Sequence, residues 1–240
     1  MPEKFQYDPD DDQLKQLFDR NREWAEEMVA QDPDYFSRLV FQALPRYFWI
    51  GCSDARVPST QITNLLPGDI FTHRNIANIV SFTDLSCLSA TQFAVDILKV
   101  RHVIITGHYD CAGVEVALKQ QRVGLVDNWL RHIQEVSKRY EQYLNESLSQ
   151  QTRVDRLCEL NAIESVGNLC QTTIIQDAWA RGQPLTVHGW IYGVHDGRIR
   201  NLGVTCNSLD EFNARKSQTL RRYEDDVKGD VLSGRNWLTD

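Results

Sequence analysis

The sequence of 240 residues lacks any apolar run that approaches the roughly 20 residues of a membrane-spanning helix. Its first residues are acidic and polar, unlike the apolar core of a secretion signal. It is also short of positive charge, with 26 Lys and Arg against 33 Asp and Glu and a formal net charge of -7. Because phosphate binding requires a basic surface, nucleic acid is not an expected partner. We expect a cytoplasmic protein with no membrane span.

Internal repeats, low-complexity tracts and long linkers are also missing from the sequence. A hydrophobic content of 42% with 25% charged residues is typical of a soluble globular protein. We therefore expect one domain over residues 1–240. It is expected to consist of a helical arm over 1–45, an α/β core over 46–206 and a helical extension over 207–240.

The arm shows a helical pattern. Between Asp11 and Ala30, apolar residues recur at helical spacing among charged ones, which predicts an amphipathic helix. Asp32 and Pro33 predict a second helix directly after it, with the aspartate as N-cap and the proline at the first helical position. Amphipathic faces of this kind usually pack on a neighbouring core or a partner subunit, so we expect packing here and no ligand binding.

Short apolar runs alternate with helical patterns in the core. Four strands are predicted, at residues 47–51, 69–72, 102–106 and 185–192, with helical segments between them that include 84–99. A turn at Asp196 and Gly197 predicts a hairpin to a fifth strand around 199–205. This alternation favours an α/β fold: a central, mostly parallel sheet of four parallel strands plus an antiparallel edge strand, flanked by helices.

Six cysteines are present, and in a reducing compartment they are expected to be thiols or metal ligands and not disulfides. Four are expected to act as small buried hydrophobes, three in helical patterns and one near a strand end: Cys87, Cys158, Cys170 and Cys206. Cys52 and Cys111 differ, because each lies near the end of a predicted strand where polar residues follow.

Cys52 begins a Cys-x-Asp-x-Arg motif, and a His-x-x-Cys motif at His108 and Cys111 follows after the third predicted strand. The carboxyl ends of parallel strands meet at one edge of a sheet, so these three side chains are expected to converge there. Thiolates and imidazole suit zinc. Structural zinc sites usually have four protein ligands, whereas catalytic sites have three and a water. The ligand count therefore favours a catalytic zinc ion.

Asp54 and Arg56 complete the first motif. An arginine two residues away is expected to keep Asp54 ionised and oriented. Zinc lowers the pKa of a bound water from about 15.7 toward roughly 7. Two thiolate ligands weaken this effect on the pKa, so a nearby hydrogen-bond acceptor is expected to assist the bound water. We interpret Asp54 as the acceptor that orients a zinc-bound hydroxide. If Arg56 releases it, Asp54 becomes a fourth zinc ligand and stops the reaction.

The combined motifs resemble the successive signatures of the β-class carbonic anhydrases. The resemblance extends from about Trp24 to Thr205 and rests on residues 50–58, 67–78, 107–113, 158–161, 178–183 and 188–192. It implies one zinc ion per subunit on Cys52, His108 and Cys111, with Asp54 and Arg56 as a catalytic dyad. The implied reaction is the reversible hydration of carbon dioxide to bicarbonate and a proton. The implied assembly is a homodimer with sites at its interface, often paired into a tetramer.

The resemblance also implies an apolar wall for carbon dioxide, formed by Val57, Phe71 and Ile76, with Phe93 reaching in from the partner subunit. Within the usual zinc segment two residues are atypical. Ala112 replaces a glycine, and Asp110 places a carboxylate beside Cys111.

One mainly bacterial subgroup of this family carries a second bicarbonate pocket, which stabilises the inactive state with the aspartate on zinc. Its marks correspond here to Trp49, Arg74 and Tyr192. An indole N–H, a guanidinium and a phenol hydroxyl together suit a small oxyanion. His73, beside Arg74, is expected only to support that arginine.

Two alternatives remain open at this point. Related zinc sites hydrolyse carbonyl sulfide or carbon disulfide, and the short motifs do not exclude that activity. A structural-zinc or thiol-based regulatory protein would also use Cys and His, but it would have four protein ligands and no exchangeable water.

Overall fold

The computed structural model describes residues 13–41 and 44–228. The chain divides into two compact units, Met1–Ala43 and Leu44–Asp240, each of which is described by itself. No helix among the described residues is both long and apolar enough to cross a membrane.

The first unit contains helices α1 (Gln13–Gln31) and α2 (Tyr35–Val40). The Trp24 ring on α1 meets Tyr35 and Phe36 on α2 edge-on, at centroid distances of 6.5 and 5.8 Å. These aromatic contacts hold the two helices together.

The start of α2 differs from the prediction, which placed the N-cap at Asp32 and the first helical residue at Pro33. The N-cap is Asp34, and the helix begins at Tyr35. Asp32 Oδ1 accepts a hydrogen bond from the backbone N–H of Asp34 at 3.1 Å. The Asp32 carboxylate therefore closes a turn between the helices, as aspartate does in an Asx turn.

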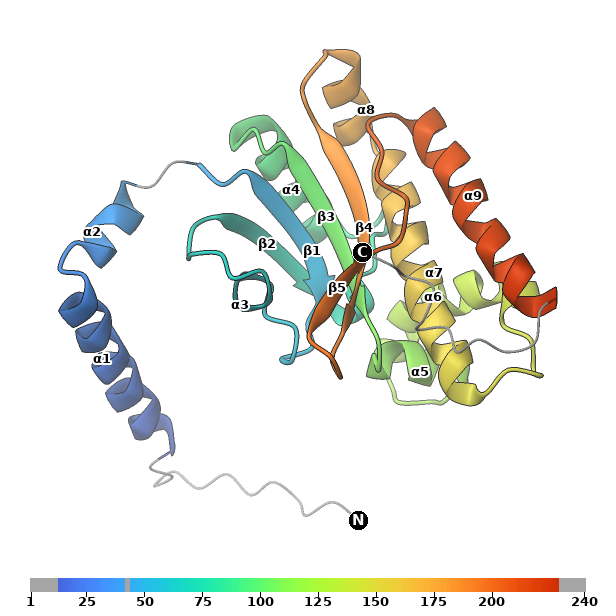
Figure 1. Cartoon of the computed structure of the whole chain (residues 1–240), viewed down its shortest axis with the longest axis horizontal. Helices are drawn as coiled ribbons and strands as arrows, with labels where there is room; N and C mark the ends of the chain where they lie inside the picture. Colours follow the sequence, from blue (N-terminus) through green and yellow to red (C-terminus); the bar gives the residue numbers. More distant parts are fainter. Residues whose placement is uncertain (1–12, 42–43, 229–240) are drawn as a thin grey trace. The chain divides into compact units, whose positions relative to one another are not determined.

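The second unit is built on a five-stranded sheet in the order β2-β1-β3-β4-β5 (Figure 1). The strands are β1 (Tyr47–Cys52), β2 (Ile70–Asn75), β3 (His102–His108), β4 (Thr186–Gly193) and β5 (Arg198–Asn201). The first four pair in parallel, and β5 pairs antiparallel with β4 at the edge. This architecture confirms the predicted fold class.

The last strand is shorter than the predicted 199–205. Asn201 is the last residue of this strand. Its side-chain Oδ1 accepts a hydrogen bond from the backbone N–H of Gly203 at 2.8 Å, and Gly203 has φ +78. That turn ends the ladder, and only an isolated bridge between Val187 and Cys206 continues the pairing. Glycine tolerates the left-handed backbone that such a turn requires.

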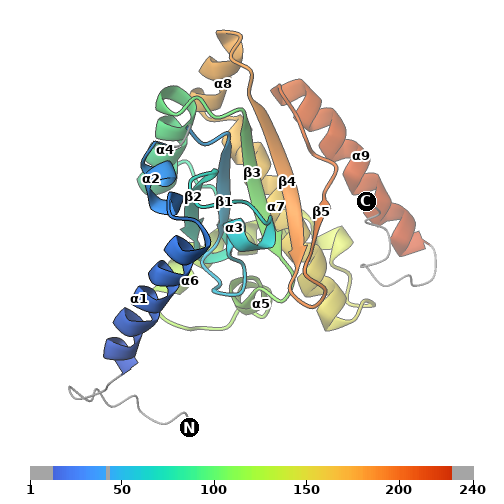
Figure 2. The ribbon, with the colours of Figure 1, turned by 60° about the vertical axis from the view of Figure 1, so that its left-hand side comes forward.

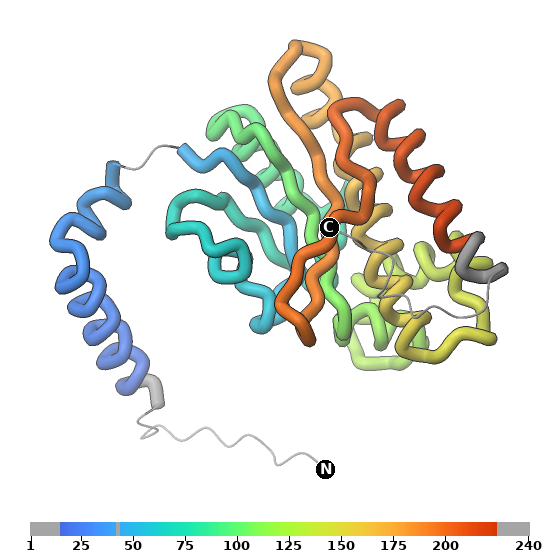
Figure 3. Tube along the Cα trace, viewed as in Figure 1, coloured from blue at the N-terminus to red at the C-terminus, as the bar shows by residue number. Residues whose placement is uncertain are grey.

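Helices flank the sheet, and the tube in Figure 3 follows the chain through them. They are α3 (Ser59–Ile62), α4 (Leu85–Gln92), α5 (Ala112–Leu118), α6 (Val126–Arg139), α7 (Gln150–Cys170), α8 (Thr173–Ala180) and α9 (Leu209–Lys228). Short turns of 3-10 helix lie at Ile76–Asn78 and Glu141–Tyr143. The predicted helix over 84–99 begins after the N-cap Asp84, passes into a π-helical turn at Phe93–Ile97, and is over at Lys99, which has φ +54.

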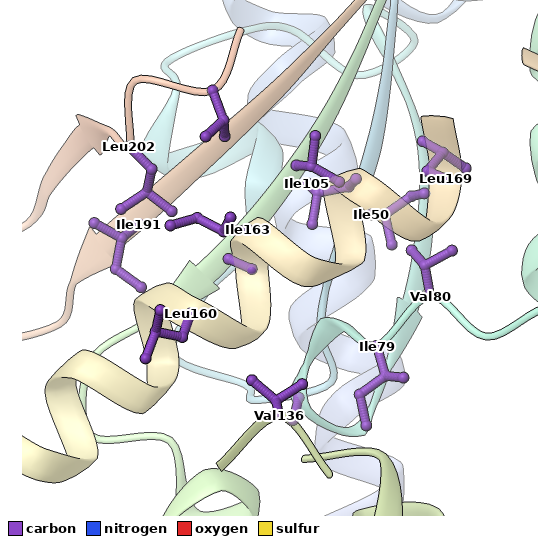
Figure 4. Close-up of a cluster of buried hydrophobic side chains, with 14 of the residues drawn as sticks. Ile50, Ile79, Val80, Ile105, Val136, Leu160, Ile163, Leu169, Ile191 and Leu202 are labelled. Atoms are coloured by element: carbon purple, nitrogen blue, oxygen red, sulfur yellow. The ribbon is translucent and has the colours of Figure 1, made fainter. Parts of the chain in front are cut away.

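The hydrophobic core lies between the sheet and α7, which packs against β3 and β4 (Figure 2). Figure 4 shows Leu160 and Ile163 of α7 beside Ile105 of β3 and Ile191 of β4. Because side chains alternate along a strand, Ile50 enters this core while its neighbour Trp49 lies on the opposite face of the sheet. α7 also contacts α5, α6 and α9, so it is buried over most of its length.

Candidate metal centre

Three candidate ligands converge at the carboxyl edge of the sheet. Cys52 is the last residue of β1, His108 is the last residue of β3, and Cys111 is the N-cap of α5. Their ligand atoms all lie within 4.8 Å of one another, and all three residues are buried. Since β1 and β3 are parallel neighbours, their ends deliver these side chains to the same place, as the sequence predicted.

The two thiols are electrically coupled. A hydrogen bond with Cys111 lowers the pKa of Cys52 to about 4, and the same bond raises the pKa of Cys111. The Cys52 sulfur also accepts from the backbone N–H of Ala77 at 3.3 Å. The pair therefore shares one proton, and a cation that displaces this proton would be held by two thiolates.

His108 presents its second nitrogen to these thiols. Its Nδ1 lies 2.8 Å from the carbonyl oxygen of Tyr109, to which it donates, so Nε2 carries the lone pair. Nε2 is buried and has no hydrogen-bond partner among the described residues. A buried lone pair beside two cysteines is the environment that a zinc ion satisfies, so the donor set fits zinc.

Asp54 and Arg56 form a two-point ion pair beside this group. Arg56 Nε donates to Asp54 Oδ1 at 3.0 Å and Nη2 donates to Oδ2 at 2.7 Å. The pairing with Arg56 lowers the pKa of Asp54 to about 2. Asp54 Oδ2 lies 3.8 Å from His108 Nε2, so the carboxylate is close to the three candidate ligands while its oxygens are held by the arginine.

Asp110, the atypical residue beside Cys111, faces away from the sulfurs. Its backbone has φ +57, and its carbonyl oxygen accepts from Arg56 Nη2 at 3.0 Å. Its carboxylate accepts from Gln151 Nε2 on α7 at 3.0 Å. Asp110 therefore supports Arg56 through its backbone, a contact that the sequence pattern did not indicate.

Comparisons with known proteins agree with this site. Residues 47–199 match the family profile described as "Carbonic anhydrase". The carbonic anhydrase of Emericella nidulans is 39% identical over 188 residues, which is 78% of this chain and 82% of that protein. The structure of the Coccomyxa β-carbonic anhydrase with acetazolamide has a TM-score of 0.80 and 35% identity, covering 88% of this chain and 97% of that one.

The chain belongs to the β-class carbonic anhydrases. Tetrameric β-carbonic anhydrases from Sordaria macrospora are also similar, with a TM-score of 0.76 and 37% identity over 80% of this chain and 98% of that one. The resemblance drawn from the sequence motifs is thereby confirmed at the level of the family.

Arg74, a residue expected in a bicarbonate pocket, lies along the loop that follows Cys52. Its Nε donates to the carbonyl oxygen of Cys52 at 2.8 Å, and its Nη2 donates to the carbonyl oxygen of Asp54. Arg56 and Arg74 thus hold the same loop, one through the Asp54 side chain and the other through the backbone.

Trp49 and Tyr192, the other expected pocket residues, are buried on the same face of the sheet as Arg74. The Trp49 indole nitrogen lies over Gly51, where an added Cβ would be only 2.4 Å away. Gly51 is in register with Arg74 on β2. Tyr192 on β4 is in register with His108, so it reaches this face from the other side of β3.

Thr106 lies between these residues and was not indicated by the sequence. It is in register with Gly51 on one side and Trp190 on the other. It is fully buried, and its hydroxyl has no hydrogen-bond partner among the described residues. From the sequence, a β-branched residue in a buried strand is predicted to be an ordinary core residue. Only the sheet register shows that the Thr106 hydroxyl lies on the same face of the sheet as Trp49.

The four residues expected to form the apolar wall lie in two separate places within one chain. Val57 is buried directly after Arg56 in the sequence, and Ile76 precedes Ala77, which contacts Cys52. Phe71 and Phe93 pair with each other, at a ring-centroid distance of 5.8 Å. Phe71 lies four residues before Asn75, the last residue of β2 at the edge that carries the candidate ligands. At the rise of a strand, four residues span roughly 13 Å. A single chain therefore does not bring all four side chains together.

Proposed function

We propose that this protein catalyses the reversible hydration of carbon dioxide to bicarbonate and a proton, with one zinc ion per subunit on Cys52, His108 and Cys111. The observation that carries the proposal is the buried, unpaired Nε2 of His108 beside two coupled thiols and an arginine-held carboxylate. A zinc ion on these ligands would lower the pKa of a water molecule enough to provide the nucleophile near neutral pH.

Asp54 is the hydrogen-bond acceptor of the mechanism. With its pKa held at about 2, it is ionised throughout the neutral range. Arg56 fixes both carboxylate oxygens, so Asp54 would accept a hydrogen bond from the nucleophile in one orientation and stay ionised, which leaves a lone pair of the nucleophile directed toward the substrate carbon. Val57 and Ile76 supply apolar surface on the same side, which suits a substrate without charge.

A homodimer, or a tetramer made of two dimers, is proposed as the assembly. Phe71 and Phe93 lie together and away from the chain's own metal ligands, with Phe93 47% exposed. In a dimer these rings would complete the apolar wall of the partner's site. The tetrameric Sordaria macrospora enzymes, 37% identical, support an assembly of this kind.

Asp54 is also proposed to switch. Its Oδ2 is 3.8 Å from His108 Nε2, so a rotation away from Arg56 would bring it to the fourth ligand position. A bicarbonate ion held by Trp49, Arg74 and Tyr192 would compete with the carbonyl oxygens that Arg74 now binds and loosen the loop that contains Asp54. The unpaired Thr106 hydroxyl would lie on the floor of that pocket.

Two further statements stay predictions. The cytoplasmic location remains a proposal that rests on the composition of the sequence. The structural-zinc alternative predicts four protein ligands. Among the described residues, the candidate zinc site has three such ligands, Cys52, His108 and Cys111, and this number favours an enzyme.

The test is carbon dioxide hydration by the zinc-loaded protein from mildly acidic to alkaline pH, measured by stopped flow. Cys52→Ala is expected to lose zinc and activity together, whereas Asp54→Ala is expected to keep zinc and lose activity. Fully zinc-loaded wild-type protein that is inactive at every pH would overturn the proposal. Faster turnover of carbonyl sulfide than of carbon dioxide would favour a hydrolase instead.

A further inference from the structure

A second group of metal-ligating side chains lies away from the proposed zinc site. His73, Asp84 and Cys87 bring an imidazole nitrogen, a carboxylate oxygen and a thiol sulfur within 4.8 Å of one another. We call these three residues the second cluster. His73 comes from the edge strand β2, while Asp84 and Cys87 come from the N-cap and first turn of α4.

His73 faces the helices and not Arg74. It is in register with Ile50, which is fully buried in the core, whereas Arg74 is in register with Gly51 on the opposite face. Successive strand residues alternate between faces, so adjacent His73 and Arg74 point in opposite directions. The expectation that His73 supports Arg74 is therefore wrong, and its imidazole instead lies beside α4.

His73 Nε2 carries the lone pair of the imidazole and is the ring nitrogen that lies near Asp84. Asn75 accepts from the backbone N–H of Ile79 and donates to its carbonyl oxygen, which fixes the orientation of the Asn75 amide. The second amide N–H of Asn75 donates to His73 Nε2 at 3.5 Å, so Nε2 is the acceptor nitrogen, and a cation bound to Nε2 would replace this long hydrogen bond. Burial lowers the pKa of His73, which favours the neutral, ligating form.

The two carboxylate oxygens of Asp84 have different surroundings. Oδ1 accepts from the backbone N–H groups of Ser86 and Cys87, at 3.1 and 3.2 Å, and so caps α4. Oδ2 faces His73 Nε2 at 4.0 Å, which is too far for a hydrogen bond. Asp84 Oδ2 and His73 Nε2 are therefore two lone-pair atoms that lie near each other without a hydrogen bond between them, and a cation placed between them would bind both.

Cys87 closes the second cluster from the core side. It is fully buried, and burial raises the pKa of its thiol to about 12. An ion that binds here must displace the thiol proton, which favours ions with strong affinity for sulfur and makes the site weaker than the one with two coupled cysteines. Ligand atoms around tetrahedral zinc lie roughly 3.3–3.8 Å apart, so a contraction of at most about 1.5 Å is enough to form the site.

We propose that the second cluster is a binding site for a thiophilic divalent cation, Zn²⁺ or Cd²⁺, with His73 Nε2, Asp84 Oδ2 and Cys87 Sγ as its ligands. The bound ion links the edge strand β2 to the start of α4. Neither its position nor its ligands depend on the proposed catalytic function.

The experiment is equilibrium dialysis of the full-length zinc-loaded protein against Cd²⁺, with total zinc plus cadmium per chain counted by mass spectrometry. Two ions per chain are expected in the wild type. One is expected in Cys87→Ser and His73→Gln, which also lack the ultraviolet sulfur-to-cadmium absorbance of the second ion. Cys170→Ser is the matched control, because it removes another fully buried thiol, and it should keep two ions.

Asp84→Asn separates the metal site from the helix cap. Asparagine caps helices about as well as aspartate, so this variant should fold, keep its first metal ion and bind the second more weakly. The proposal is overturned if the wild type binds one ion only, or if the second ion persists in Cys87→Ser. Circular dichroism and retention of the first ion report that each variant is folded, so loss of the second ion is not a folding effect.

Discussion

Arg56 binds both carboxylate oxygens of Asp54, yet Asp54 Oδ2 lies only 3.8 Å from Nε2 of His108, a candidate metal ligand. The Asp54 backbone carbonyl is held separately, by Arg74. The side chain and the backbone N–H of Arg56 both hold the Asp54 carboxylate, so rotation of that carboxylate requires the loss of these contacts, while Arg74 keeps the loop backbone in place. In the proposed mechanism, the pairing of Asp54 with Arg56 decides whether Asp54 helps or blocks the reaction.

Replacing Arg56 is the direct test of that interaction. Arg56→Ala should keep zinc but lower kcat/KM for carbon dioxide hydration roughly a hundredfold, because the acceptor loses its orientation. Arg56→Lys keeps the charge but loses the two-point geometry, so its kcat/KM should lie between those of the wild type and Arg56→Ala. Stopped-flow assays with zinc content measured in parallel provide the check, and near-wild-type activity in Arg56→Ala would contradict the dyad.

Thr106 allows the proposed bicarbonate pocket to be tested without removing a charge. Thr106→Val keeps the shape and deletes a buried hydroxyl that has no protein partner, so the free energy of unfolding should rise by about 1 kcal/mol or stay unchanged. Bicarbonate inhibition at low pH should become weaker and less cooperative, as in Arg74→Ala. Inhibition curves that match the wild type in both variants would argue against the pocket.

Gly51 is expected to be intolerant of a side chain. In Gly51→Ala the new Cβ would lie 2.4 Å from the Trp49 indole nitrogen, so the ring must move, at a cost of about 1–3 kcal/mol in unfolding free energy. Trp49→Phe provides space, so the double variant should lose less stability than the sum of the two single variants. Urea unfolding of the four proteins measures this coupling, and strict additivity would show that the clash is relieved elsewhere.

Glu159 should make stability depend on pH. Both Tyr109 and Tyr223 donate to its carboxylate, and burial raises its pKa to about 8 from the usual 4.5. Below pH 4.5 the group is neutral in both folded and unfolded states. As pH rises toward 8 only the unfolded state ionises, so stability falls by an amount on the order of a few kcal/mol.

Glu159→Gln removes this ionisation, so its unfolding free energy should change less between pH 5 and pH 8 than that of the wild type. Thermal unfolding at several pH values is the measurement, with Glu224→Gln as control because Glu224 is exposed and accepts a hydrogen bond from Tyr143 at 3.1 Å at the surface. An equally steep pH dependence in Glu159→Gln would assign the effect to other groups.

Local patterns predicted the strands and the convergence of the ligands well. Runs such as 47–51 and 102–106 are too apolar to be exposed, and parallel pairing of their strands brings Cys52 and His108 to one edge. Boundaries were less predictable where a side chain competed for the backbone. Asp32 closed a turn instead of capping a helix, and Asn201 ended β5 early.

The sequence by itself determined the family, the fold class and the three candidate zinc ligands, because these follow from residue types at strand ends and from motif spacing. Only the tertiary structure decided which face each strand residue occupies. That decision placed His73 with Asp84 and Cys87, left the Thr106 hydroxyl unpaired and moved Phe71 away from its own metal site. Strand alternation defines two faces, but only packing against α4 and α7 determines which face is the core.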